Sequence, residues 1–369
     1  MKILLIITGL GIGGAETQLC DLADNFLFEE SNEIIIVSLS KHKILKKPKN
    51  KKIKIVSLNI EKTPISFLVG FIKAIKLVKR FKPDIIHSHM YHANIFSRFL
   101  RIFCKIPVLI STAHSSDEGG KLRMFLYRIT DRLASISTNV SQEAVESFIE
   151  KNATTKNRMI AIYNGIDTNK FHYSKQVREK IRNQLGFSDN DIILLSVGRL
   201  TKAKDYPNLF HAFSALPNRE NIYLLIIGTG EEENNLRNLA NHLNITKNII
   251  WIGLKYNVQD WLSACDIFIL SSQWEGFGLV VAEAMATERV VIGTDCGGIK
   301  EVIGNYGFII PKKDSTALKN SINKVLQLTD RERTNLGFNA RNHIENNFSL
   351  NMISKQWLSL YSKLHDKKR

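Results

Sequence analysis

The feature that most constrains this 369-residue chain is the alternation of short apolar runs with longer stretches of helical periodicity. A first series of runs is KILLIIT (2–8), EIIIVSL (33–39), PDIIHSH (83–89), PVLISTAH (107–114) and ASISTN (134–139). A second series is DIILLSVGR (191–199), IYLLIIGTG (222–230), IIWIG (249–253), DIFILSS (266–272) and RVVIGTD (289–295). Nearly continuous apolar strands separated by helices are typical of parallel sheets covered on both faces.

Two such series predict an α/β chain with two doubly wound domains. We place the boundary in YNGIDTNKF (163–171), where an Asn-Gly turn follows an apolar run. The predicted domains are residues 1–165 and 166–347, followed by a C-terminal helix over 348–369. The apolar positions of that helix would suit packing on either domain. Ligands of open parallel sheets bind at the carboxyl ends of the strands, so functional residues should gather there.

Composition narrows the class of protein. Apolar residues make up 44% of the chain, and no apolar stretch reaches the length of a membrane-spanning helix. The N-terminal run MKILLIITGLGIGG is too soon broken by glycines for a signal peptide. The four cysteines are scattered without metal-ligand spacing, which favours a reducing cytoplasm.

Charge is distributed unevenly along the chain. Residues 1–170 hold 26 Lys and Arg against 15 Asp and Glu, whereas the remainder holds 25 against 20. A basic first half indicates an anionic partner there, which would be a nucleic acid, a membrane surface or a phosphorylated substrate. Simple solubility explains the charge equally well. A nucleic-acid-binding protein would not account for the glycine-rich turns, and no known nucleic-acid module is visible.

The first glycine-rich turn directly follows the first strand. Gly9, Gly11 and Gly14 match the G-x-G-x-x-G pattern of dinucleotide sites. The acidic residue that normally closes the second strand and binds a ribose is missing. One alternative is therefore an NADP-dependent oxidoreductase in which Ser40 and Lys41 bind a phosphate. The other is a tight turn that lets backbone N–H groups approach a different ligand, or none.

The second series carries cations and glycines at its strand ends. Arg199 and Lys204 follow the strand DIILLSV, and both side chains suit a diphosphate. Gly228 and Gly230 follow the next strand, where backbone can approach a base or a ribose.

The segment SSQWEGFGLVVAEAMA (271–286) follows a later strand and opens a helix. The free N–H groups at Gly278 and Leu279 would attract a phosphate. Glu275 would accept hydrogen bonds from sugar hydroxyls, and Glu283 would bind a ribose diol. Glu283 lies in an apolar context, and an unpaired buried carboxylate is costly, which favours a ligand role.

Together these segments resemble the retaining glycosyltransferases of family 4, which have the GT-B fold. The matching pieces are GIGGAET, AHS, NGID, VGRLTKAK, EGFGLVVAE and GTDCGG, and they cover nearly the whole chain in family order. The resemblance implies two Rossmann-like domains that face each other across a cleft. It also implies that the C-terminal helix crosses back to the first domain.

The resemblance also implies roles for individual residues. Glu275 and His114 would contact the donor sugar, and Arg199 and Lys204 would hold the diphosphate and stabilise the leaving group. Glu283 would bind the ribose. The remaining donor-binding positions are Gly13, Gly14, Gly230, Lys255, Gly276, Phe277, Gly278 and Leu279.

Two other patterns imitate metal sites. The segment HSHMYH contains His87, His89 and His92, but no carboxylate has clear ligand spacing to them. We therefore expect no metal there, and His89 or His92 would instead lie near the acceptor. The Asp-Asn-Asp segment at 189–191 resembles the metal motif of other glycosyltransferases, but it precedes a strand and is predicted to be a turn.

The resulting hypothesis is a retaining glycosyltransferase that needs no metal or other cofactor. It would move a hexose or N-acetylhexosamine from a nucleotide sugar, with UDP expected from the family, to a lipid-linked or membrane-embedded glycan. The resemblance places it in bacterial O-antigen, lipopolysaccharide or capsule synthesis. The alternatives are the NADP-dependent oxidoreductase and a GT-B nucleotide-sugar epimerase.

The first half would provide the contact with a membrane. Basic and apolar residues mix at helical spacing in segments 67–82, 95–105 and 121–132, and a charged loop spans 41–54. Such segments suit an anionic bilayer surface, although helices that pack on their own sheet would look similar. We therefore expect a cytoplasmic protein that is peripherally associated with the inner face of the cytoplasmic membrane.

Overall fold

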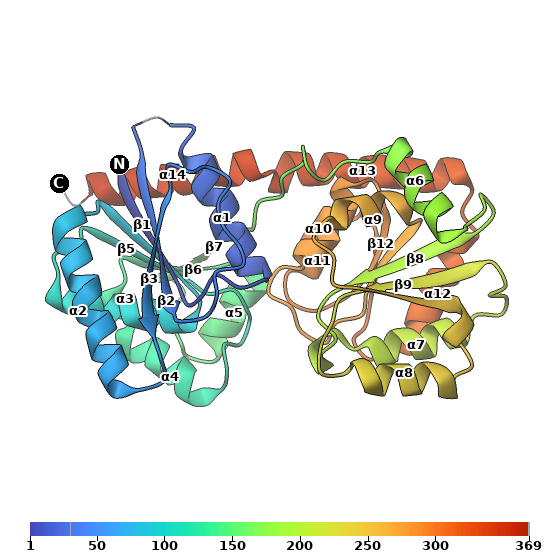
Figure 1. Ribbon diagram of the computed structural model, residues 1–369, viewed down its shortest axis with the longest axis horizontal. Coiled ribbons are helices and arrows are strands. Elements are labelled where there is room, and N and C mark those ends of the chain that lie inside the picture. Colours follow the sequence, from blue (N-terminus) through green and yellow to red (C-terminus); the bar gives the residue numbers. More distant parts are fainter. Residues whose placement is uncertain (30, 368–369) are drawn as a thin grey trace. The chain divides into compact units, whose positions relative to one another are not determined.

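The computed structural model describes residues 1–29 and 31–367 and divides into two compact units (Figure 1). Unit 1 comprises Met1–Gly165 and Leu350–Arg369, and unit 2 comprises Ile166–Ser349. Each unit is an α/β layer structure around one parallel sheet, as the alternating pattern predicts.

Unit 1 contains a seven-stranded sheet in the order β3-β2-β1-β4-β5-β6-β7, and all of its pairings are parallel. The strands are β1 (Lys2–Ile7), β2 (Glu33–Ser40), β3 (Lys54–Ile60), β4 (Ile85–His89), β5 (Val108–Thr112), β6 (Ile136–Asn139) and β7 (Met159–Ala161). The helices are α1 (Gly14–Phe26), α2 (Pro64–Phe81), α3 (Tyr91–Phe103), α4 (Lys121–Thr130), α5 (Gln142–Glu150) and α14 (Leu350–Asp366), with a 3-10 turn η1 (Asp131–Leu133).

Alternation along the strands of unit 1 creates two apolar faces. Ile3, Leu5 and Ile7 of β1 pack with α1 and α14 on one face, where Trp357 and Tyr361 are buried. Leu4 and Ile6 pack with α2 and α3 on the other. In Figure 1, α14 runs above the sheet of unit 1, α3 and α4 lie below it, and α2 stands at its left side. The C-terminal helix therefore completes the core of unit 1.

Unit 2 contains a six-stranded parallel sheet in the order β10-β9-β8-β11-β12-β13. The strands are β8 (Ile192–Val197), β9 (Ile222–Ile227), β10 (Ile249–Gly253), β11 (Ile267–Leu270), β12 (Val290–Thr294) and β13 (Phe308–Ile310). The helices are α6 (Lys175–Leu185), α7 (Tyr206–Ser214), α8 (Glu233–His242), α9 (Val258–Ala264), α10 (Leu279–Ala286), α11 (Ile299–Ile303), α12 (Ser315–Leu326) and α13 (Asp330–Phe348), with 3-10 turns η2 (Lys202–Lys204) and η3 (Thr246–Asn248). Its main apolar core lies under α7, α8 and α12.

Some elements lie outside the sequence predictions. β3 is half exposed at the sheet edge, and β7 and β13 have three residues each, so their apolar signal is short. The 19-residue α13 is mostly polar, but a capping box of Thr329 and Glu332 fixes its start. α13 ends at Phe348, and the single residue Ser349 separates it from α14, which begins at Leu350.

None of the helices within residues 1–29 and 31–367 combines the length and the apolar content that crossing a bilayer requires.

Candidate functional site

In unit 2, the loops that carry the predicted donor-binding residues follow four neighbouring strands. β10, β9, β8 and β11 are parallel and adjacent, so their carboxyl ends meet at one edge of the sheet. Arg199 and Lys204 follow β8, Gly230 follows β9, Lys255 follows β10, and Glu275 follows β11. The fold therefore gathers residues that are up to 76 positions apart along the chain.

Lys204 and Glu275 form the polar centre of this edge. The Lys204 Nζ donates to Glu275 Oε1, which also accepts a hydrogen bond of 2.8 Å from the Ser272 hydroxyl. The two charged side chains are only 20% and 15% exposed. A cation and a carboxylate are thus held together and shielded from solvent, close enough to bind a phosphate and a sugar hydroxyl of one ligand.

Backbone hydrogen bonds fix these loops against one another. Gln273 N donates to Ala203 O over 2.8 Å, which ties the β11–α10 loop to the turn that contains Lys204. The Ser271 hydroxyl donates to the carbonyls of Lys204 and Asp205. Leu200 N donates to Thr229 O, which joins the loops after β8 and β9. The site is therefore preorganised by main chain.

Two glycines allow that close approach. A Cβ on Gly228, which has φ +142°, would lie 1.9 Å from Gly198 O. A Cβ on Gly230 would lie 2.3 Å from Leu200 O. Both obstacles are backbone carbonyls that no rotamer change removes, so only glycine fits at either position.

The turn before α10 is also built on glycine. Gly278 has φ +85° and precedes the first residue of α10, Leu279. Gly297, with φ +55°, lies so close to the Glu275 carbonyl that a Cβ would approach it to 2.1 Å. The Gly276 carbonyl accepts a hydrogen bond from Gly298 N. As at the start of any α-helix, the first N–H groups of α10 point toward the turn that precedes it, where they can donate to an anion.

The remaining predicted residues of unit 2 differ in their surroundings. Phe277 is 2% exposed, and its ring packs edge-on against Phe348, so only its backbone can meet a ligand. Arg199 and Lys255 are exposed, and Lys255 Nζ lies 5.7 Å from the centre of the Trp261 ring. Glu283 is partly exposed, which contradicts the burial that we expected from its apolar neighbours in sequence. Helical geometry turns its side chain away from the core that its neighbours enter.

In unit 1, the ends of β4 and β5 carry a cluster of three histidines. His87 is buried, and its nitrogens lie 2.6 Å from the Tyr361 and Thr112 hydroxyls. His89 Nδ1 lies 3.0 Å from His114 Nε2. Hydrogen bonding thus fully engages His87, which explains its presence without a metal. His114 has one ring nitrogen oriented by His89, and the turn after β4 is strained at Met90, with φ +73°.

Glu118, Tyr127 and Asn94 support His114, and the sequence analysis missed them. Glu118 Oε1 accepts from His114 N over 3.1 Å, and Glu118 Oε2 accepts from the Tyr127 hydroxyl. Asn94 Nδ2 donates to the Tyr127 oxygen over 2.9 Å. A Glu four residues after the predicted His, in AHSSDEGG, was the available signal. Asn94 and Tyr127 lie on α3 and α4, so their contact with the loop that carries Glu118 has no signal in the local sequence.

Burial controls protonation in this cluster. Removal from water lowers the pKa of His114 to about 4, and it lowers the pKa values of His87 and His89 well below their usual range, with further effects of neighbouring histidines. Burial also raises the pKa of Glu118, which its hydrogen bonds only partly offset. The imidazoles are therefore neutral near pH 7 and act as hydrogen-bonding groups.

The glycines of the first glycine-rich turn, in unit 1, face movable side chains, whereas Gly228 and Gly230 of unit 2 face backbone carbonyls. Gly13 is extended and precedes α1, which begins at Gly14. A Cβ on Gly9 would meet the Ser40 hydroxyl at 2.8 Å, and one on Gly13 would meet the Glu16 carboxylate at 2.5 Å. Lys41, which with Ser40 would bind the phosphate in the NADP alternative, forms an exposed ion pair with Glu61, with Nζ 2.5 Å from Oε1.

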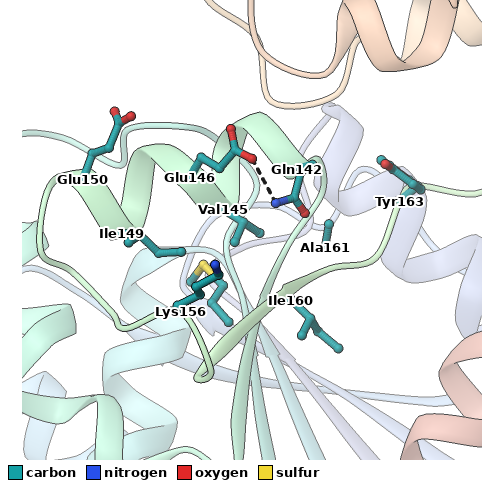
Figure 2. A pocket seen from close by; sticks show the side chains of 10 residues that line it. Gln142, Val145, Glu146, Ile149, Glu150, Lys156, Ile160, Ala161 and Tyr163 are labelled. Carbon is teal, nitrogen blue, oxygen red and sulfur yellow. Dashed lines mark hydrogen bonds between the residues drawn. The ribbon is translucent and has the colours of Figure 1, made fainter.

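The possible metal sites and the pocket between α5 and β7 have less support as functional sites. Within the described part of the chain, no three His, Cys, Asp or Glu side chains gather as a metal ion would need. Residues 189–191 form a turn before β8, where Asp191 Oδ2 accepts from Ser188 N. A pocket of about 710 Å³ lies between α5 and β7 and is lined by Gln142, Glu146, Ile160 and Tyr163 among others. Figure 2 shows these side chains. The pocket contains none of the predicted residues.

Comparison with protein families yields two matches along the chain. A model described as Glycosyltransferase Family 4 matches residues 12–170, and one described as Glycosyl transferases group 1 matches residues 177–343. The two matches fall on the successive α/β series.

Curated relatives include several glycosyltransferases. N-acetyl-alpha-D-glucosaminyl L-malate synthase of Bacillus anthracis is 26% identical, with 78% of this chain and 77% of the relative covered. The UDP-Gal:alpha-D-GlcNAc-diphosphoundecaprenol alpha-1,3-galactosyltransferase of Escherichia coli is 28% identical, covering 78% and 77%. The capsular polysaccharide biosynthesis glycosyltransferase CapM of Staphylococcus aureus is 27% identical over 91% of both chains.

Among solved structures, Anabaena HepE in complex with UDP superposes with a TM-score of 0.85. It is 21% identical, and the alignment covers 98% of this chain and 100% of HepE. Similarity at this level of identity establishes a shared fold.

Proposed function

Because the chain belongs to the family 4 glycosyltransferases and has their GT-B fold, we propose that it is a retaining, metal-independent enzyme that uses a UDP-sugar. The transferred sugar is a hexose or an N-acetylhexosamine, and the acceptor is a lipid-linked glycan of bacterial surface polysaccharide synthesis, that is, O-antigen, lipopolysaccharide or capsule. The enzyme acts in the cytoplasm at the inner face of the membrane. Two relatives support this acceptor class by their names, one for a diphosphoundecaprenol-linked glycan and one for capsule.

The observation that carries the proposal is the Lys204–Glu275 pair at the glycine-lined edge of unit 2. Lys204 and Arg199 would bind the diphosphate, with the N–H groups at Gly278 and Leu279. Glu275 would accept hydrogen bonds from sugar hydroxyls, and Glu283 from the ribose. Gly230 and Lys255 would contact the nucleoside through backbone.

The chemistry follows from these contacts. The acceptor oxygen attacks the anomeric carbon on the face from which the diphosphate leaves, so the new bond keeps the donor's configuration. The C–O bond to the diphosphate breaks with its electron pair on oxygen, and that oxygen takes the acceptor's proton. Arg199 and Lys204 stabilise the charge that develops there, in place of a metal ion. His114, which is neutral and oriented by His89, is our candidate for a contact with the sugar.

A thermal-shift panel of UDP, GDP, ADP, UDP-hexoses, UDP-N-acetylhexosamines, NAD and NADPH tests the donor class. A ligand at 100 times its Kd stabilises the folded protein by about 2.7 kcal/mol. We expect UDP and one UDP-sugar to raise Tm in the wild type and not in Glu283→Ala. A shift caused by NADPH alone would reject the proposal.

Product analysis tests the reaction itself. Incubation with the donor and a synthetic lipid-diphosphate glycan should release UDP and give a glycan whose new linkage has the donor's anomeric configuration by NMR. EDTA should not lower the rate. A free epimerised sugar nucleotide would identify an epimerase instead, and an inverted linkage would contradict the retaining mechanism.

A further inference from the structure

Large apolar side chains are exposed mainly on one layer of unit 1. Of the 20 that are exposed among the described residues, 11 lie on α2, α3 and α4, helices that together have 41 residues. They are Ile65, Phe67, Leu68, Val69, Ile72, Phe99, Ile102, Phe103, Leu122, Phe125 and Ile129. Ile65 is 77% exposed and Leu122 is 72% exposed. So dense a set on adjoining helices marks an interaction surface.

These side chains form stripes opposite the buried faces of their helices. Ile65, Leu68, Val69 and Ile72 follow the i, i+3, i+4, i+7 spacing along α2. Phe99, Ile102 and Phe103 do so along α3, and Leu122, Phe125 and Ile129 along α4.

The three helices are neighbours in one layer on the same side of the sheet (Figure 1). The rings of Phe71 and Phe103 lie 5.5 Å apart, which joins α2 to α3. We call the exposed surface of α2, α3 and α4 the three-helix face.

The charge on the three-helix face has a single sign. α2, α3 and α4 contain no Asp or Glu at all. Lys73, Lys76, Lys79 and Arg80 of α2 are exposed, as are Lys121 and Arg128 of α4. The arginines of α3 do not contribute, contrary to the sequence expectation, because Arg98 is buried on Thr130 and Ser137, and Arg101 donates to the Leu133 carbonyl.

We propose that the three-helix face docks on an anionic lipid bilayer, with its apolar stripes in the headgroup region and its lysines at the phosphates. Exposed apolar groups surrounded by cations, with no acids among them, match such a surface. A second copy of the chain is a poor partner, because its face would carry the same charge. The docking itself is argued from exposure and charge alone. Its biological role, which is to bring the enzyme to a lipid-linked acceptor, rests on the proposed function.

Sedimentation with vesicles tests the docking. The full-length protein should bind vesicles of phosphatidylcholine with 30% phosphatidylglycerol, and binding should weaken at least tenfold between low and high salt. Lys73→Glu/Lys76→Glu should lower partitioning at least 20-fold, because each surface lysine is worth about fivefold. Leu68→Ser/Ile72→Ser/Phe125→Ser should lower it at least tenfold. The matched controls are Lys247→Glu/Lys312→Glu and Phe338→Ser, exposed residues of unit 2, which should bind like wild type.

A labelling experiment covers the case in which a face variant does not fold. All four native cysteines are buried, so a cysteine introduced by Phe125→Cys can be selectively coupled to a polarity-sensitive dye. We expect a blue shift on addition of anionic vesicles, and none for the same dye at Phe338→Cys.

The outcomes separate docking from catalysis. Donor-induced thermal shifts and transfer to a water-soluble acceptor should stay unchanged in the face variants, so a failed transferase assay leaves the docking result standing. Absence of vesicle binding by the wild type, or equal binding by face variants and controls, would overturn the proposal. So would a dimer that the face variants convert to a monomer, because the partner would then be a second copy.

Discussion

The two units share a parallel doubly wound architecture but differ in charge. Unit 1 carries 30 Lys and Arg against 15 Asp and Glu, whereas unit 2 carries 21 against 20. Unit 2 places one shielded ion pair, Lys204–Glu275, in the loops at the carboxyl ends of its strands. Unit 1 spreads cations over its outer helices and places neutral histidines at its strand ends. One scaffold thus supports two chemistries, because strands and packing fix the frame while the loops decide what it binds.

The glycine-rich turns show the same contrast. In unit 2, a side chain at Gly228 or Gly230 would collide with backbone carbonyls. In unit 1, side chains at Gly9 or Gly13 would meet the movable ends of Ser40 and Glu16. A similar sequence pattern is therefore a rigid steric requirement in one unit and an adjustable one in the other.

The largest effect is expected from a substitution that breaks the Lys204–Glu275 pair of unit 2. Lys204→Ala should lower kcat by about 10²–10³-fold, because the departing diphosphate loses a preorganised cation. Initial rates with the UDP-sugar give the value, and Tm reports on folding. Lys202→Ala, on the same 3-10 turn but exposed, is the control and should retain wild-type kcat. A Lys204→Ala enzyme with more than half of the wild-type kcat would remove Lys204 from the mechanism.

The histidine cluster should make unit 1 the acid-sensitive unit. Between about pH 6.5 and 4 the unfolded chain protonates His114 while the folded unit does not, so the free energy of unfolding falls as pH falls. His114 alone accounts for roughly 3 kcal/mol. Hydrogen exchange, corrected for intrinsic rates, should show β4 and β5 losing protection before β8 and β9.

Replacing the histidine provides the check. His114→Asn should reduce this pH dependence but not abolish it, because His87 and His89 remain buried, and His242→Asn, at an exposed position of α8, should leave it intact. Equal loss of protection in both units of the wild type would show that the cluster does not govern acid stability.

Substituting one glycine in each unit tests the difference between the two glycine-rich turns. Gly230→Ala should lower the free energy of unfolding by about 1–3 kcal/mol, because the Cβ forces the loops after β8 and β9 apart. It should also weaken UDP binding. Gly11→Ala should have little effect, since its Cβ would lie 3.7 Å from the nearest atom, the Glu16 carboxylate. Urea denaturation and UDP titration measure both, and equal behaviour of the two variants would contradict the distinction.

The smallest expected effect concerns the dinucleotide site of the NADP alternative. Lys41→Ala removes an exposed pair with Glu61 and should change neither Tm nor transferase activity measurably. NADPH should not stabilise either protein. A variant that lost NADPH-dependent stabilisation would revive the alternative use of the first glycine-rich turn.

Much of this architecture was readable from the sequence. Ten apolar runs predicted ten strands, because a strand covered on both faces must be apolar throughout. The three missed strands are short or lie at edges, where less burial is needed. The meeting of Arg199, Lys204 and Glu275 at one edge of the sheet could be predicted, because parallel topology places the carboxyl ends of neighbouring strands together. The burial of Glu283 was wrongly expected, since sequence neighbours on a helix face different directions.

The sequence by itself determined the two α/β series, the positions of their glycine-rich turns and the excess of cations in the first. Only the tertiary structure decided which groups meet. It pairs Lys204 with Glu275, supports His114 with Glu118 and Tyr127, and draws Arg98 into the core. The spacing of apolar residues in the C-terminal helix suited either domain, and the structure packs α14 against the sheet of unit 1. The physical reason is that periodicity follows from local burial, whereas these contacts join segments that only the packing of the whole unit brings together.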